Sequence, residues 1–383
     1  MRGHVAKKGK RYYVVLDVGV DERGKRKQKW LSGFDTKSEA ERGLTEALSA
    51  VDRGTYIEPS RQTLERYLLD EWLPACAARI RPTTVESYRH LIELHVVPAI
   101  GRTPLAQLTP LSLTKFYGTL LTNGRVRGSG GLSPRTVRYV HSIIRKAMSD
   151  AVAWRLLPTN PCDGAVPPSA AAAKSPEMKV WNADQVRAFL DFTREDRDYI
   201  TWHLAVSCGL RRGEVCGLRW SDLSLDATPP TLSVKQQLVE SMYRLTFAPP
   251  KTARGKRLVV LDPVTVAALR AHRARQAAER LALGAAYDDH DLVVARLDGT
   301  PVHPNNVGQH FRRQIVKAGL PLIRFHDLRH THATLALQAG IHPKIVSERL
   351  GHASTSFTLD VYSHATPTMQ QQAADLMSAV LSR

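Results

Sequence analysis

The stretch that decides the fold lies near the end of the chain, over residues 325–364. It contains F-H-D-L-R-H-T-H at Phe325–His332 and L-G-H at Leu350–His352, and Tyr362 follows shortly after. Histidines and an arginine that can bind an oxyanion thus precede a phenol that can act as a nucleophile. In a strongly basic chain, this combination predicts phosphoryl transfer on nucleic acid.

The composition favours a polyanionic partner. The chain has 383 residues, with 54 Lys and Arg against 36 Asp and Glu, so the formal net charge is 54 − 36 = +18. A chain of this length is expected to form two or three domains. It contains no apolar run of about 18 residues, no signal peptide and no lipidation motif. We therefore expect a cytoplasmic protein whose partner is a polyanion such as nucleic acid, with an anionic membrane as the rival.

The cysteines and histidines do not predict a metal site. The four cysteines form no C-x-x-C pair and suit reduced thiols of a cytoplasm. His326 and His330 are four residues apart, as in the H-E-x-x-H zinc motif. However, Asp327 stands where that motif has glutamate, and Arg329 adds a positive charge beside the histidines. A cation beside arginines would be repelled, so we predict no metal and no cofactor.

Residues 1–54 predict a small basic module. Arg11–Val18 and Lys25–Leu31 favour strands. Thr36 precedes Glu39 with the spacing of a capping box, which predicts a helix to about Val51. A solvated basic hairpin and a β-ribbon placed in a DNA groove both fit this pattern. The candidate DNA contacts are Lys25, Arg26, Lys27 and Lys29.

Residues 62–156 predict an all-helical module. Its expected helices are Thr63–Ala78, Val85–Val97, Thr109–Leu121 and Arg135–Leu157, with Pro98–Gly101 ending the second. Basic residues lie mostly off the apolar face of the last helix. They form either a solvated face or a set of phosphate contacts: Arg135, Arg138, Arg145 and Lys146. The proline-rich residues 157–180 predict a linker, and residues 181–383 a further domain.

Two motifs upstream of the deciding stretch carry charged candidates. Arg211 and Glu214 stand three apart in G-L-R-R-G-E, so on one helix face the carboxylate could orient the guanidinium. An ordinary surface pair is the alternative, and Arg212 is the rival register. Lys251 lies in P-P-K-T between the strand-like segments 232–239 and 257–261, with Lys256 as the alternative lysine.

Within the deciding stretch, His326 and Arg329 are expected on one helix face, where both can meet one phosphate. His332 falls on the adjacent apolar stripe and is predicted to be structural. A short helix over residues 343–350 is expected to end at Gly351, just before His352. Beyond Tyr362, residues 366–383 predict a tail helix with a narrow apolar stripe. A helix this short must pack on something, either on its own domain or in trans on a neighbouring protomer of a tetramer.

In this order, G-x-R-x-x-E, P-K-T, H-x-L-R, L-G-H and the tyrosine resemble the signature of the tyrosine recombinases, the phage integrase family. Residues 1–54 are similar to the arm-type DNA-binding domain of that family, which implies a three-stranded sheet plus a helix. Residues 62–156 resemble its all-α core-binding domain, joined by the 157–180 linker to a catalytic domain, 181–383. That domain is expected to be mostly α, with a small antiparallel sheet and the tail helix.

The resemblance also implies a mechanism. Tyr362 would attack a scissile phosphodiester and form a 3′-phosphotyrosyl bond, with His326 as the base and Lys251 as the acid for the 5′ oxygen. The phosphate would be bound by Arg211, Arg329 and His352, with Glu214 in support. No ATP or metal is required, because the phosphotyrosine conserves the bond energy.

The partners implied are double-stranded DNA at core and arm sites and a homotetramer on that DNA, in a bacterial cell. A DNA-bending host factor and a directionality factor are candidate accessory proteins. The expected activity is integration or excision of a phage or mobile element. Three alternatives stay open: a chromosome-dimer resolvase, a type IB topoisomerase-like enzyme and a non-catalytic DNA-binding regulator.

Overall fold

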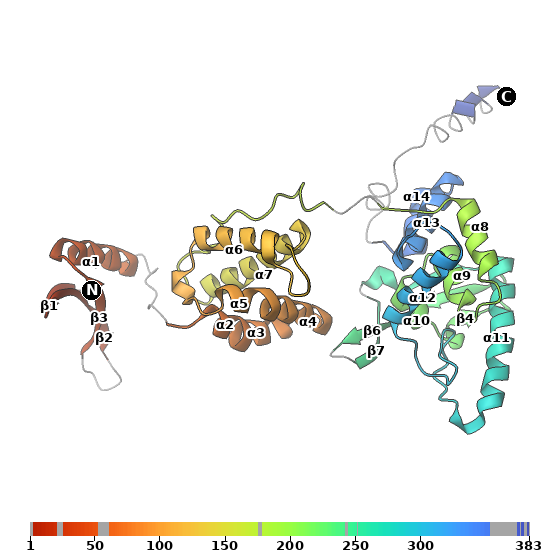
Figure 1. Ribbon diagram of the computed structural model, residues 1–383, viewed down its shortest axis with the longest axis horizontal. Coiled ribbons are helices and arrows are strands. Elements are labelled where there is room, and N and C mark those ends of the chain that lie inside the picture. Colours follow the sequence, from red (N-terminus) through yellow and green to blue (C-terminus); the bar gives the residue numbers. More distant parts are fainter. Residues whose placement is uncertain are drawn as a thin grey trace. The chain divides into compact units, whose positions relative to one another are not determined.

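The computed structural model describes residues 3–20, 26–52, 61–174, 178–241, 244–250 and 252–352, with three short pieces at 374–375, 377–378 and 381–382. The chain divides into two compact units, Met1–Ser175 and Pro176–Arg383. Figure 1 shows the elements of each. Within the described part of the chain, no helix has both the length and the apolar character needed to cross a bilayer.

The first unit begins with an antiparallel sheet covered by one helix. Its elements are β1 (Gly3–Lys8), β2 (Arg11–Val20), β3 (Arg26–Phe34) and α1 (Lys37–Asp52), and β2 is the central strand. Val14 and Leu16 of β2 pack with Ala40 of α1 in a small core. The predicted capping box is present: the Thr36 and Glu39 N–H groups each donate 3.2 Å to the other side chain.

The rest of the first unit is helical. Its α-helices are α2 (Leu64–Arg66), α3 (Leu73–Ala77), α4 (Pro82–Leu91), α5 (Val97–Ile100), α6 (Pro110–Asn123) and α7 (Pro134–Ala153). π-helical turns at Tyr67–Trp72 and Ile92–Val96 join α2 to α3 and α4 to α5, and a 3₁₀ turn spans Leu105–Gln107. The apolar face of α7 is buried as predicted, and the Tyr67 hydroxyl donates 2.7 Å to the Ala147 carbonyl.

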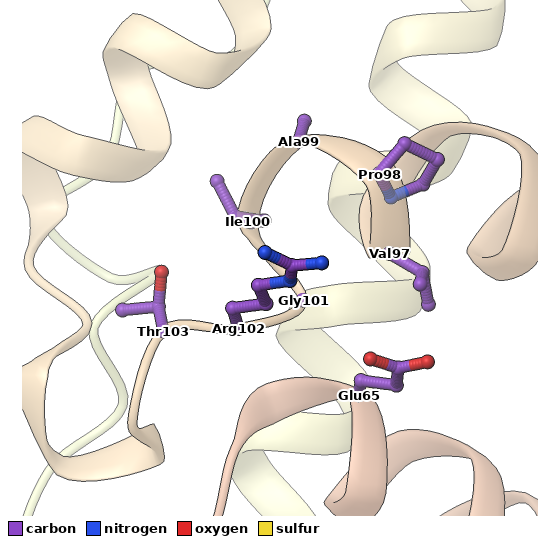
Figure 2. A pocket seen from close by; sticks show the side chains of 8 residues that line it. All are labelled: Glu65, Val97, Pro98, Ala99, Ile100, Gly101, Arg102 and Thr103. Atoms are coloured by element: carbon purple, nitrogen blue, oxygen red, sulfur yellow. The ribbon is translucent and has the colours of Figure 1, made fainter.

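The helix predicted to end at Val97 runs on through Pro98, although it does end within the predicted stop at Pro98–Gly101. The Val97 N–H bonds to the Ile92 carbonyl, five residues back, so a π-helical turn precedes the proline. Pro98 therefore stands in the first turn of α5, where an absent N–H removes no hydrogen bond. The helix ends at Ile100 instead. Residues 97–103 then curve around a cavity of about 510 Å³ that Glu65 also lines (Figure 2).

Residues 157–168, predicted as part of a linker, lie against this helical region. Leu157 and Cys162 are buried in its core. The Arg138 guanidinium donates 2.9 Å to the Pro168 carbonyl, and Arg145 donates 3.0 Å to the Asp163 carboxylate. The proline-rich stretch is therefore fastened to the first unit as far as Pro168.

In the described part of the second unit, seven helices pack around a core of aliphatic and aromatic side chains. They are α8 (Ala183–Phe192), α9 (Tyr199–Ser207), α10 (Arg212–Cys216), α11 (Pro263–Leu283), α12 (Pro304–Lys317), α13 (Phe325–Gln338) and α14 (Pro343–Leu350). Trp181, Phe189, Trp202 and Phe311 form an aromatic cluster at its centre. Nearly all of α9 is buried, whereas α11 lies along one side of the unit (Figure 1).

Five short strands complete the second unit: β4 (Leu223–Ser224), β5 (Thr231–Val234), β6 (Gln237–Ser241), β7 (Arg244–Ala248) and β8 (Arg257–Val260). One antiparallel sheet has the order β4-β5-β8, and β6 and β7 form a separate ribbon. Short 3₁₀ turns occupy Trp220–Asp222, Ala253–Gly255 and Gly284–Ala286.

The segment 232–239 was predicted as one strand and forms parts of two. Tertiary contacts of the two residues between β5 and β6 explain the break. Lys235 pairs with the Asp222 carboxylate at 3.2 Å, and the Gln236 amide donates 3.0 Å to the Gly217 carbonyl. These contacts turn the chain away from the first sheet, so that β6 packs against α10 and α12.

Candidate active site

Arg211 lies immediately before α10 and not within it, which corrects the prediction of a shared helix face. It is the N-cap residue, with extended backbone angles, and Glu214 is the third helical residue. The Glu214 carboxylate accepts 2.9 Å from the Arg211 N–H and 2.7 Å from its guanidinium. The Arg211 side chain is 36% exposed against 2% for Glu214, so a ligand can reach the cation while its partner is buried.

A second cation holds Glu214 from the other side. The Arg257 guanidinium donates to both carboxylate oxygens, at 3.1 and 2.9 Å. Burial alone would raise the pKa of Glu214, but hydrogen bonds and charge from Arg257 and then Arg211 lower it below its usual range. The carboxylate is therefore ionised between two arginines. No local sequence pattern marks Arg257 as a partner of Glu214, which lies 43 residues away.

The N-terminus of α13 repeats this cap. Arg324 is the N-cap residue, and its N–H and guanidinium both donate to the Asp327 carboxylate, at 2.7 and 2.8 Å. The cap fixes the start of α13. This helix carries both His326 and Arg329, as predicted. Sequence reasoning missed this pair, although an arginine three residues before an acid at a helix start was visible as a signal.

Arg329 is buried and joins two distant turns. Its guanidinium donates 2.6 Å to the Gly209 carbonyl and also donates to the Leu350 carbonyl. Gly209 has φ +64, and a Cβ there would lie 2.4 Å from a Leu350 methyl carbon. Only glycine permits this close approach, which brings the turn before α10 against the end of α14.

The turn after α14 presents His352. Gly351 ends the helix in the left-handed conformation, as predicted, and its carbonyl accepts 3.2 Å from the Arg211 guanidinium. The His352 N–H donates 3.0 Å to the Ser347 carbonyl, which fixes its backbone. Burial, followed by the charges of Arg329 and Arg211, lowers the pKa of His352 to about 3.

His326 is also a neutral imidazole near neutral pH, although part of its residue is exposed. Desolvation lowers its pKa to about 4, and His330, Arg329 and Arg211 add to this effect. The rings of His326 and His330 meet edge to face, with centroids 4.9 Å apart. A neutral ring can accept a proton, which suits the predicted base.

His332 is structural, as predicted. Its Nδ1 lies 2.8 Å from the Val206 carbonyl oxygen, and its Nε2 is buried without a hydrogen-bond partner among the described residues. Burial and the charge of Arg349 lower its pKa to about 4. The ring thus joins α13 to α9 as a neutral side chain.

The ends of α10, α13 and α14 bring five predicted residues together: Arg211, Glu214, His326, Arg329 and His352. The predicted nucleophile Tyr362 and the predicted acid Lys251 lie outside the described residues. The rival Arg212 extends toward α12, where its Nη1 is 3.5 Å from the place of a Cβ on Gly308. This geometry favours Arg211 over Arg212 as the phosphate ligand.

The predicted DNA contacts outside this site belong to two elements of the first unit, α7 and β3. On α7, Arg135, Arg145 and Lys146 are exposed, and Arg138 and Arg145 also bond to Pro168 and Asp163. In the basic module, Arg26, Lys27 and Lys29 belong to β3, where Arg26 is paired with Val20 and Lys29 with Leu16. Lys25 lies outside the described residues.

Three family models match successive parts of the chain. The Arm DNA-binding domain matches residues 4–51, and the phage integrase N-terminal SAM-like domain matches residues 65–121. The model described as the phage integrase family matches residues 179–369.

Relatives and solved structures agree with these matches. A tyrosine recombinase XerC-like protein of Caldanaerobacter subterraneus subsp. tengcongensis is 26% identical over 388 residues, which cover 97% of each chain. The Tn1549 transposon integrase in complex with a circular intermediate DNA has a TM-score of 0.66 at 19% identity, over 82% of this chain and 99% of that one. A lambda integrase tetramer bound to a Holliday junction gives 0.56 at 18%, over 94% and 95%. Because matching models account for the basic module, the helical region and the unit that holds the arginines and histidines, this chain belongs to the phage integrase family of tyrosine recombinases.

Proposed function

We propose that this recombinase cuts and rejoins DNA at specific sites through a 3′-phosphotyrosyl intermediate on Tyr362, and so integrates or excises a phage or mobile element. The convergence of Arg211, Arg329 and His352 at the meeting of three helix ends carries the proposal. Two guanidiniums and a neutral imidazole around one point suit a phosphodiester, whose non-bridging oxygens gain charge in the transition state.

Arg211 and Arg329 bind the non-bridging oxygens, and His352 donates a further hydrogen bond to them. Glu214 orients Arg211 from the buried side. A bound phosphate also opposes the effect of the two arginines on the neighbouring histidines, so it raises the pKa of His326 and His352 from the low values of the free protein.

The chemical step exchanges one phosphorus–oxygen bond for another. The Tyr362 oxygen attacks phosphorus while its phenol proton passes to His326, and the bond to the 5′ oxygen breaks. Lys251 protonates that oxygen, so a 5′-hydroxyl leaves. In the reverse direction, the 5′-hydroxyl of another strand attacks the phosphotyrosine. The bond energy is conserved, so rejoining consumes no nucleotide and requires no metal.

We assign the parts of the chain to separate DNA contacts. Residues 1–54 bind arm sites through Lys25, Arg26, Lys27 and Lys29, and residues 62–156 and 181–383 bind the core site, joined by residues 157–180. The tetrameric form of lambda integrase on a Holliday junction supports a homotetramer on DNA. A DNA-bending host factor and a directionality factor are candidate accessory partners.

Chromosome-dimer resolution is the second candidate function. The similarity to the XerC-like recombinase favours it. The match of residues 4–51 to an Arm DNA-binding domain favours integration, because a protein that binds only a core site has no use for a second DNA-binding module.

Replacing the nucleophile tests the chemistry. Tyr362→Phe should bind core-site DNA normally and form no covalent adduct, because the attacking oxygen is missing. A nicked suicide substrate, analysed on a denaturing gel, measures the adduct. Tyr287→Phe is the matched control, since that hydroxyl lies outside the arginine and histidine cluster, and it should trap DNA like the wild type. If Tyr362→Phe still traps DNA covalently, another residue is the nucleophile.

A further inference from the structure

Arg257 is the first residue of β8, and its side chain is only 5% exposed. Its guanidinium makes four hydrogen bonds. Two are to Glu214, at 3.1 and 2.9 Å, and the others are to the carbonyls of Arg349, at 2.6 Å, and Gly255, at 3.2 Å. A buried cation with planar donors thus joins β8, α10 and α14.

The charges around Glu214 give this contact a consequence for phosphate binding. A carboxylate paired with Arg211 alone would cancel the charge that must attract the phosphate. With Arg257 on its other side, the three groups carry one net positive charge, and the accessible part of that group is Arg211. Arg257 therefore allows Glu214 to orient Arg211 without neutralising it.

The same side chain abuts the turn that presents His352. A Cβ on Gly351 would lie 2.7 Å from the Arg254 carbonyl oxygen and 3.1 Å from the Arg257 Cδ. Since the Gly351 carbonyl accepts from Arg211, the guanidiniums of Arg211 and Arg257 fix the two sides of one turn. Displacement of Arg257 would release both Glu214 and this turn.

We propose that Arg257 is a positioning residue for DNA cleavage: it holds Glu214, and through it Arg211, in the geometry that binds the scissile phosphate. It touches the partners of the phosphate and not the DNA. This inference rests on the proposed role of Arg211, and it adds a residue that sequence motifs do not distinguish from the other bases of residues 254–257.

Two substitutions separate charge from geometry. Arg257→Lys keeps the charge but loses the planar fork, so it cannot bond both Glu214 oxygens and the Arg349 carbonyl together. Arg257→Gln also removes the charge. We expect single-turnover cleavage to fall about 10- to 100-fold in Arg257→Lys, the range known for residues that orient direct ligands, and further in Arg257→Gln. Core-site binding should be retained. Arg270→Gln, an exposed arginine of α11, is the control and should cleave normally.

A double-mutant cycle tests whether Arg257 acts through Glu214. Glu214→Gln removes the buried anion that Arg257 balances, so the loss of cleavage in the double variant Glu214→Gln/Arg257→Gln should be clearly smaller than the product of the two single losses. A purely structural role predicts multiplied losses together with a lower melting temperature. Multiplied losses would overturn the proposal, and Arg257→Lys keeps the test valid if Arg257→Gln does not fold.

A modified substrate identifies the step. Sulfur in place of the bridging 5′ oxygen gives a thiolate that leaves without a proton. It should therefore restore cleavage to Lys251→Ala and not to Arg257→Gln, whose defect concerns the non-bridging oxygens. Restoration of Arg257→Gln would mean that Arg257 serves the Lys251 segment instead, and the proposal would be wrong.

Arg211→Ala on the same substrates distinguishes failure of the proposed phosphate-binding role of Arg211 from failure of the positioning role of Arg257. If Arg211→Ala cleaves like the wild type, the proposed function of the arginine cluster fails. If Arg211→Ala is inactive while Arg257→Gln and Arg257→Lys both cleave like the wild type, only the role of Arg257 fails.

Discussion

Six histidines of the catalytic unit have lowered pKa values, and burial is the largest cause at each: His203, His272, His326, His330, His332 and His352. Three of them, His326, His330 and His352, lie at the arginine cluster. The other three bond to neighbouring segments as neutral rings: His203 to Thr265, His272 to Val293 and His332 to Val206. Low pKa values therefore identify the active site only in combination with geometry.

His332 makes the stability of the catalytic unit depend on pH. Its folded pKa is about 4, below an unfolded value near 6.5, so the unfolded chain binds the proton first as pH falls. Stability should be constant above about pH 6.5 and fall toward pH 4, by on the order of 3 kcal/mol from this residue if the shift is fully expressed.

The His332→Asn variant tests this dependence. Its amide can keep the hydrogen bond to the Val206 carbonyl without titrating. Thermal unfolding across this pH range should therefore show a shallower loss of stability for the variant than for the wild type. Equal slopes for the two proteins would show that the buried ring does not govern the acid sensitivity.

At the scale of elements, helix ends build the candidate active site. Arg211 and Arg324 cap α10 and α13 through carboxylates in the first turn, and Gly351 ends α14. Helix ends carry unpaired backbone groups and partial charges, so they place donors and acceptors at fixed points. Here the last carbonyls of α14 orient Arg329 and Arg257.

The turn after α14 should tolerate no side chain. Gly351→Ala imposes left-handed strain of about 1–2 kcal/mol and also pushes its Cβ against the Arg254 carbonyl and the Arg257 side chain. It should lower both stability and single-turnover cleavage.

Gly340→Ala is the matched control, because Gly340 has φ +80 after α13 and a Cβ there meets no atom within 4 Å. Gly340→Ala should therefore lose stability through backbone strain alone, and the folded variant should cleave DNA normally. If both variants cleave equally well, the contact between the turn and β8 has no part in catalysis.

At the scale of the whole molecule, the basic module has a core of its own. Val14, Leu16 and Ala40 form a cluster separate from the helical core built on α7. The core of the helical region and the core of the second unit contain none of the module's described residues. Its removal is therefore expected to change DNA binding and to leave the remaining domains folded.

Deleting residues 1–53 should abolish protection of distal arm-type sites and leave the core site bound more weakly. Fewer phosphate contacts should also reduce the dependence of affinity on salt. Footprinting and salt titrations of both proteins on an attachment site measure these effects, and cleavage of a core-only suicide substrate is the control. An unchanged footprint would limit the module to a role in folding or solubility.

The sequence by itself determined what depends on neighbours within a helical turn. The Thr36–Glu39 capping box and Gly351 were identified as caps because their partners lie three or four residues away. The same local spacing predicted the pairing of Arg211 with Glu214. The order of motifs then indicated the family, since residues of one active site keep their order along related chains.

Only the tertiary structure decided which distant groups meet. Arg257 bonds Glu214 across 43 residues, and Arg329 bonds the Gly209 carbonyl across 120. No local pattern specifies such partners, because many arginines have the same propensities and only the docking of β8 and α14 selects among them. Breaks such as the one at Lys235, and the passage of a helix through Pro98, have the same origin: packing outweighs local preference where a tertiary contact or a π-helical turn satisfies the backbone.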